Sequence, residues 1–163
     1  MNYEAAKAIV SEWLGREPVP GIIARRNPSS EIAPKGSVLA IVGARRSGKT
    51  FLMYQMAQKA ESEGGSSLLV DFEDYRLTSL VPGDMELFLR AQSELADQPL
   101  THLFLDEVHS LPEWSRVIST LCNRRRYHIV VSGSNARLLE REVSTELSRR
   151  HTSRRMLPLS FAE

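Results

Sequence analysis

The chain has 163 residues, a length that predicts one domain with a substantial core. Its 42% hydrophobic and 25% charged residues are typical of a globular protein, and no apolar run is long enough to predict a membrane span. The N-terminus lacks the pattern of a signal peptide, and the single cysteine, Cys122, excludes an internal disulfide and suits a reducing compartment. We therefore expect a cytoplasmic protein that does not contact a membrane.

Strand and helix patterns alternate along most of the chain. Apolar residues recur near the helical period over residues 2–14, and glycine and proline then break the pattern. The predicted strands are 37–42, 67–72, 100–106, 128–132 and 154–159, and the predicted helices are 2–14, 49–63, 84–97, 112–123 and 134–148. This alternation predicts an α/β fold whose parallel sheet is covered by helices on both faces. We divide the chain into an N-terminal helix and linker that pack on the core, residues 1–35, and the core domain itself, residues 36–163.

A glycine-rich loop follows the first predicted strand and fits the pattern G-x-x-x-x-G-K-[S/T] without exception. Glycine at both ends of the loop lets successive backbone N–H groups turn inward, and the following helix N-terminus adds unpaired donors, so the loop suits phosphate. Lys49 is expected to reach the β- and γ-phosphates, and the Thr50 hydroxyl to join the shell of Mg²⁺. The predicted nucleotide-binding residues are Gly43, Ala44, Arg45, Arg46, Ser47, Gly48, Lys49, Thr50 and Phe51. A glycine-rich turn with a surface lysine is the alternative.

An apolar strand ending in Asp106 and Glu107 supplies the second acidic element. The carboxyl ends of parallel strands meet at one edge of the sheet, where ligands of open α/β sheets bind. We expect Asp106 to hold Mg²⁺ directly or through water, and Glu107 to orient or deprotonate an attacking water. Glu107 favours hydrolysis of a triphosphate over the transfer reaction of small-molecule P-loop kinases. ATP is favoured by elimination, because the Asn-Lys-x-Asp element typical of P-loop GTPases is missing.

Small polar residues end the strand predicted at 128–132. If this strand lies beside the Asp106 strand, Ser134 or Asn135 would contact the γ-phosphate or the attacking water. Both residues would serve equally as an N-cap for the helix predicted after them. His109 is interpreted as a loop histidine and Cys122 as a buried thiol.

Residues 124–155 contain nine arginines and three glutamates, a local excess of six positive charges. Arg149 and Arg150 are candidates for a finger that acts on the nucleotide of a neighbouring subunit, because guanidinium suits phosphoryl charge; a solvated basic turn is the alternative. Nucleic acid as a partner is left open, since no reading motif accompanies the arginines. Asp71, Glu73 and Asp74 end the second predicted strand. They either support the residues that contact the nucleotide or are simply solvated.

Five stretches in this order resemble the prokaryotic AAA-type ATPases of the AAA_14 family, found in archaea and bacteria and often joined to a C-terminal DUF4143 domain. These stretches are residues 43–50, 69–77, 103–109 with the following Trp114, 131–139 and 157–163. The resemblance covers most of the chain from about residue 20.

The resemblance implies a three-layer P-loop fold of the AAA type, in which one strand separates the Asp106 strand from the phosphate-loop strand. It also implies Glu107 as the catalytic base, Ser134 or Asn135 at a sensor position, Arg150 as the finger, and a homo-oligomer as an option for the full-length protein. Where the family pattern resembles Leu-Ser-Gly-Arg, this chain reads Leu-Ser-Arg149-Arg150, so either arginine is a candidate. We expect a lid and a C-terminal domain beyond the last residue, and slow turnover without them.

Overall fold

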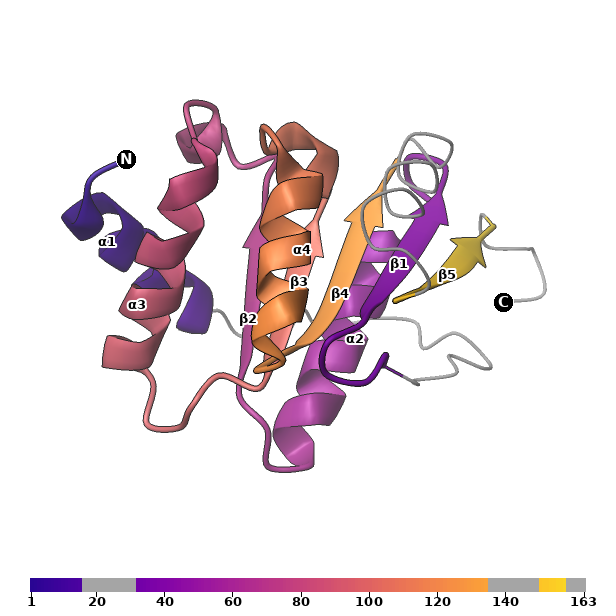
Figure 1. Cartoon of the computed structure of the whole chain (residues 1–163), viewed down its shortest axis with the longest axis horizontal. Coiled ribbons are helices and arrows are strands. Elements are labelled where there is room, and N and C mark those ends of the chain that lie inside the picture. Colours follow the sequence, from indigo (N-terminus) through magenta and orange to yellow (C-terminus); the bar gives the residue numbers. More distant parts are fainter. Residues whose placement is uncertain (16–31, 135–149, 158–163) are drawn as a thin grey trace.

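A five-stranded, fully parallel sheet forms the centre of the molecule. The computed structural model describes residues 1–15, 32–134 and 150–157. The strands are β1 (Val38–Gly43), β2 (Ser67–Asp71), β3 (His102–Asp106), β4 (His128–Gly133) and β5 (His151–Met156), and their spatial order is β2-β3-β4-β1-β5. The helices are α1 (Tyr3–Leu14), α2 (Lys49–Ser62), α3 (Met85–Leu95) and α4 (Trp114–Arg124), with the short 3-10 helices η1 (Tyr75–Leu77), η2 (Pro82–Asp84) and η3 (Val108–Ser110). Every strand therefore ends at the same edge of the sheet (Figure 1).

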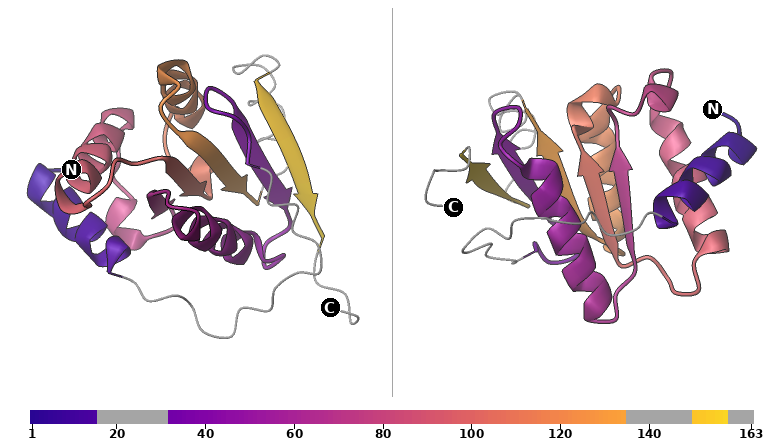
Figure 2. Two further views of the ribbon diagram at one scale, coloured as in Figure 1. Left: turned by 90° about the horizontal axis from the view of Figure 1, so that it is seen from below. Right: turned by 180° about the vertical axis from the view of Figure 1, so that it is seen from behind.

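Side chains alternate between two apolar layers, one on each face of the sheet. In β3, Leu103 and Leu105 join a cluster with α1, α3 and α4, whereas Phe104 joins a cluster with α2. Ile129 and Val130 of β4 divide in the same way. Because the side-chain period of a strand is two, these continuous apolar runs bury both faces. The result is a three-layer arrangement, with α2 on one face and α4 on the other (Figure 2).

The first helix lies against α3, beyond the β2 edge of the sheet (Figure 2). Asn2 caps it, since its side chain accepts a hydrogen bond from the backbone N–H of Ala5. The buried face of α1 contains Ala6, Ile9, Val10 and Trp13, and the Trp13 ring lies 5.6 Å from that of Phe88 in α3. None of the described helices is long and apolar enough to cross a membrane.

The predicted α/β class, the parallel sheet and its helical cover are confirmed. The strand order also confirms what the resemblance implied, because β4 lies between β3 and β1. The last strand begins and ends earlier than predicted, at His151–Met156 instead of 154–159. Its polar outer positions give it little apolar pattern of its own, and its register comes from pairing with β1. The linker and the helix predicted at 134–148 lie almost entirely outside the described residues.

Candidate functional site

The loops after β1, β2 and β3 surround a hollow of about 620 Å³ at the carboxyl edge of the sheet. We call it the edge hollow. Its lining is mostly charged and polar: Arg45, Arg46, Gly48, Lys49, Thr50, Phe51, Asp71, Glu73, Asp106 and Glu107. Three segments far apart in sequence meet there because parallel strands end on one side.

The loop between β1 and α2 bends sharply. Gly48 has φ +87° and Arg46 has φ +61°, both in the left-handed region that glycine adopts without steric cost. The bend leads directly into α2, which begins at Lys49, so the free N–H groups of its first turn lie beside the edge hollow. A backbone of this shape provides inward-facing donors and the partial positive charge of a helix N-terminus.

Lys49 is folded back over this loop, and only 4% of its surface is exposed. Its ammonium nitrogen lies 3.2 Å from the carbonyl oxygens of Gly43 and Ala44, to which it donates. The same nitrogen lies 3.2 Å from Oε1 of Glu107. The three hydrogens of the ammonium group thus have three oxygen partners, and one of them is a buried carboxylate.

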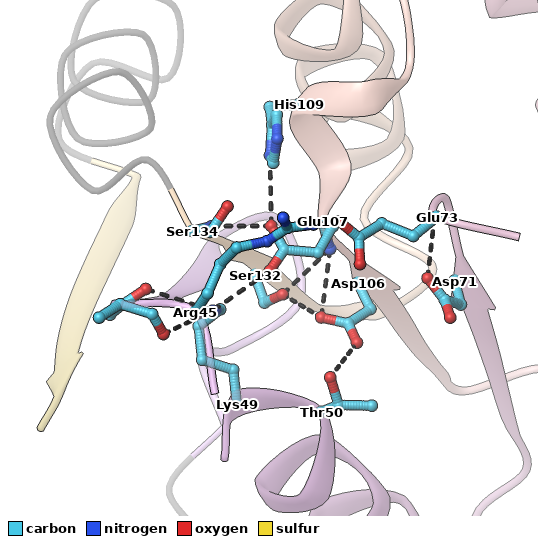
Figure 3. Close-up of polar contacts among 12 residues, drawn as sticks. Arg45, Lys49, Thr50, Asp71, Glu73, Asp106, Glu107, His109, Ser132 and Ser134 are labelled. Carbon is cyan, nitrogen blue, oxygen red and sulfur yellow. Dashed lines mark hydrogen bonds and ion pairs between the residues drawn. The ribbon is translucent and has the colours of Figure 1, made fainter. Parts of the chain in front are cut away.

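Asp106 of β3 connects α2 with the neighbouring strand β4. Thr50 Oγ1 donates to its Oδ2 over 2.6 Å, and the Ser132 hydroxyl donates to its Oδ1 (Figure 3). The alternation of side chains along a strand explains why Asp106 and Ser132 meet. Asp106 and Ser132 follow Phe104 and Val130 by two residues, so they share the face that α2 covers.

Glu107 lies just past the end of β3 with φ +48° and ψ +47°, a conformation that costs a residue with a side chain roughly 1–2 kcal/mol. Its backbone N–H is shared between Asp106 Oδ1 and Ser132 Oγ, each at 3.1 Å. Its carboxylate is 3.2 Å from Lys49 through Oε1 and accepts the N–H of Ser134 at Oε2 over 2.7 Å. The left-handed turn therefore directs this carboxylate toward the loop after β1 (Figure 3).

The end of β2 adds two further carboxylates. Asp71 pairs in register with Asp106 and accepts the backbone N–H of Glu73 over 2.9 Å. Burial, and then the nearby charges of Asp106 and Glu73, raise the pKa of Asp71, while the Glu73 N–H works against the rise. Glu73 itself accepts a 2.6 Å bond from Arg45, whose exposed guanidinium reaches across from the loop after β1.

Some predicted site residues lie elsewhere. Arg150 precedes β5 at the opposite, amino edge, where its carbonyl accepts the N–H of Val38 and its guanidinium donates to Asn123. The length of β1 puts it about 17 Å from the edge hollow of its own chain. Asn135 and Arg149 lie outside the described residues. By contrast, Phe51, a predicted nucleotide-binding residue, does line the edge hollow, and 51% of its surface is exposed.

Ser132 and His109 also belong to this group of side chains, although neither was predicted to have a role in the site. Ser132 bonds to Asp106, and His109 Nδ1 lies 3.4 Å from Glu107 Oε2. The only available signal for Ser132 was a polar residue in an otherwise apolar strand, two positions before Ser134. Cys122 is buried as predicted, and burial raises the pKa of its thiol to about 11.

The oxygen donors at the floor of the edge hollow suit Mg²⁺. The Thr50 hydroxyl and the Asp106 carboxylate are already 2.6 Å apart, and both are the hard oxygen ligands that this ion prefers. Among the described residues no group of three or more His, Cys, Asp or Glu side chains forms a metal cage. An ion held by one or two protein oxygens together with substrate phosphates fits this donor set.

Comparisons with known proteins found one family and two relatives that are similar to this chain. The family described as AAA_14, AAA domain, matches residues 35–163. An uncharacterized protein of Methanocaldococcus jannaschii is 30% identical over 126 residues, which cover 77% of this chain and 27% of that protein. An uncharacterized protein of Haemophilus influenzae is 30% identical over 129 residues, covering 77% of this chain and 32% of that protein. The chain therefore spans a third or less of these relatives.

A solved structure supports the fold alone. The structure of C. elegans PCH-2 is similar with a TM-score of 0.53 and 15% sequence identity, covering 97% of this chain and 41% of that one.

Proposed function

Because the chain belongs to the AAA domain family and is a nucleotide-binding, ATPase-like domain of the P-loop fold, we propose that it binds ATP with Mg²⁺ in the edge hollow and hydrolyses it. Hydrolysis would drive or switch an attached domain or a partner. The matched segments make up a third or less of the relatives it resembles, which leaves room for such a domain in proteins of this kind.

The observation that carries this proposal is the convergence of four side chains on one hollow. Lys49 and Thr50 begin α2, Asp106 ends β3 and Glu107 follows it directly. Thr50 nevertheless contacts Asp106, and Lys49 contacts Glu107. A cation, a hydroxyl and two carboxylates at the bend of a phosphate loop are the groups that triphosphate chemistry requires.

Lys49 would exchange partners when the nucleotide enters. Its present partners are two backbone carbonyls and Glu107, and phosphate oxygens replace them in this proposal. The N–H groups of the loop and of the first turn of α2 would donate to the same phosphates. Thr50 and Asp106 would hold Mg²⁺, which supplies positive charge to the β- and γ-phosphates.

Glu107 would accept the proton of the attacking water. Once Lys49 turns to the phosphates, Oε1 loses its cationic partner, while Oε2 keeps the N–H of Ser134. Oε1 of Glu107 would then face the part of the edge hollow beside the loop after β1. A positioned carboxylate of this kind contributes about 10²- to 10⁴-fold to a rate.

A nucleotide-gated switch with negligible turnover is the second candidate. It is favoured by the buried pairing of Glu107 with Lys49, since a carboxylate that keeps this partner is a poor base. In that case occupancy of the hollow by a triphosphate would itself change the affinity for a partner. Transfer of phosphate to a small molecule is the third and weakest candidate.

Single-turnover hydrolysis of radiolabelled ATP with Mg²⁺ tests the proposal. We expect Glu107→Gln to slow the wild-type rate by about a hundredfold or more, because the base is lost. ATP affinity should be kept or increased, since one negative charge near the phosphates is removed. Glu63→Gln, which removes an exposed carboxylate at the far end of α2, is the matched control and should behave as the wild type.

The outcomes separate the candidates. Equal, slow hydrolysis by wild type and Glu107→Gln, with tight ATP binding by both, would favour the switch. Label found on an acceptor other than water would favour phosphate transfer. Failure of the wild type to bind any nucleoside triphosphate would exclude all three.

A further inference from the structure

His109 lies beside the Glu107 carboxylate and has a buried ring nitrogen aimed at it. Its Nδ1 is buried and makes no hydrogen bond to any described residue, but it lies 3.4 Å from Glu107 Oε2. In Figure 3 the imidazole stands directly over this carboxylate. His109 does not line the edge hollow, so it has no direct access to a nucleotide there.

We propose that His109 is a positioning residue that, with the backbone N–H of Ser134, holds Oε2 of Glu107 and so leaves Oε1 to act on water. This inference rests on the proposed function. Oε2 has the two nitrogen neighbours, at 2.7 Å from Ser134 and 3.4 Å from His109, whereas Oε1 has Lys49. When Lys49 turns to phosphate, only the contacts to Oε2 still fix the direction of the carboxylate.

The backbone around His109 is rigid enough for this task. Val108 and Leu111, on either side of it, are buried in the core. The N–H of Ser110 donates to the carbonyl of Glu107 over 3.0 Å, which closes the turn of η3 onto the residue being positioned. The backbone of His109 is therefore held close to Glu107.

The present separation of 3.4 Å is longer than an N–H···O hydrogen bond, which has 2.7–3.2 Å between heavy atoms. A buried donor without a partner costs free energy, so closing this gap by a few tenths of an ångström is favourable. Either form of the imidazole that carries hydrogen on Nδ1 can donate this bond.

Substitutions of His109 test the inference. Asn has its amide nitrogen the same number of bonds from the backbone as Nδ1, whereas Leu offers no donor. We expect His109→Leu to hydrolyse ATP about tenfold or more slowly in single turnover, because misplacing a reacting group slows a reaction to this degree. His109→Asn should keep most of the wild-type rate. ATP affinity measured by calorimetry should be unchanged in both variants.

Two controls make the result specific. Ser110→Ala changes an exposed neighbour in η3 and should leave rate and affinity as in the wild type. In a Glu107→Gln background, His109→Leu should add no further loss, because His109 acts through Glu107.

Each outcome decides the inference. Wild-type hydrolysis by His109→Leu, a rate for His109→Asn as low as that of His109→Leu, or a further loss in the Glu107→Gln background would overturn it while leaving the proposed function intact. Absence of hydrolysis by the wild type would overturn the proposed hydrolysis and this inference together.

Discussion

Gly43 ends β1 at a point where a methyl group has no space. A Cβ there would lie 2.5 Å from the carbonyl oxygen of Met156 and 2.8 Å from Ser47 Oγ. Met156 belongs to the paired edge strand β5, so its backbone cannot move aside without disturbing that strand. The close approach of loop and strand therefore requires glycine.

We predict that Gly43→Ala both weakens nucleotide binding and destabilises the fold. Overpacking of this kind costs about 1–3 kcal/mol, which lowers Tm by about 3–10 °C in a domain of this size. Gly83→Ala is the control, since a Cβ at Gly83 meets nothing within 4 Å. Thermal unfolding and ATP titration measure the two effects. Wild-type values of both in Gly43→Ala would contradict the steric argument.

At the residue scale, the sequence predicted the residues with a local motif and missed those that depend on register. Lys49 and Thr50 follow from one contiguous pattern, and Asp106 from the end of an apolar strand. The contact of Ser132 with Asp106 depends on how β3 and β4 align, which one sequence does not reveal. The place of His109 depends on the left-handed turn at Glu107, which has no glycine to mark it. The roles assigned to all of these residues remain predictions.

Helix α1 is attached to α3 by charge as well as by apolar contact. Glu94 of α3 accepts hydrogen bonds from Lys7 Nζ over 3.1 Å and from Arg90 Nε over 3.0 Å. The Arg90 guanidinium also lies 4.3 Å from the centre of the Tyr3 ring. The Tyr3 hydroxyl, then Lys7 and Arg90, lower the pKa of Glu94 from 4.5 to about 2.

The sign of this shift gives a pH dependence. A carboxyl whose pKa is lower in the folded state stabilises the fold above its unfolded pKa, and this stabilisation is lost as the pH falls. We predict that Glu94→Gln lowers Tm at pH 7 and that its difference from the wild type shrinks between pH 4.5 and pH 2. Circular dichroism melts measure the difference, with Asp97→Asn, an exposed neighbouring carboxylate, as control. A difference that is constant across this range would refute the assignment to Glu94.

At the element scale, apolar elements were predicted well and polar ones were not. Strands β1, β3 and β4 are buried on both faces, so their residues form continuous apolar runs. Strand β5 is an edge strand with exposed polar positions, and its limits were misplaced. The short helices η1, η2 and η3 were not predicted, because three residues are too few to show a period.

At the scale of the whole molecule, alternation of strands and helices predicted the class of fold but not the order of the strands. Alternating elements are compatible with several doubly wound orders, and the placement of β4 between β3 and β1 was implied only by the resemblance to AAA-type ATPases. This order separates the loop after β1 from Asp106 by one strand, and Ser132 of that strand bonds to Asp106. The strand order thus sets the separation between the loop after β1 and Asp106 across the edge hollow.

A nucleotide that binds the folded chain but not the unfolded chain should stabilise the whole domain. A ligand at 100 times its Kd adds about 2.7 kcal/mol, which raises Tm by about 5–10 °C for a domain of this size. We predict such a shift with ATP and Mg²⁺, and a smaller one with ATP and EDTA, because Thr50 and Asp106 would then lack the ion they are proposed to hold. Parallel melts with GTP, CTP and UTP test the proposed preference for ATP.

The variant Lys49→Ala tests where the nucleotide binds. Its Tm without ligand falls, because Glu107 is left buried beside an empty space, and the ATP shift of the variant is measured from that lower value. An equal ATP shift in Lys49→Ala and in the wild type would mean that the nucleotide binds somewhere other than the loop after β1.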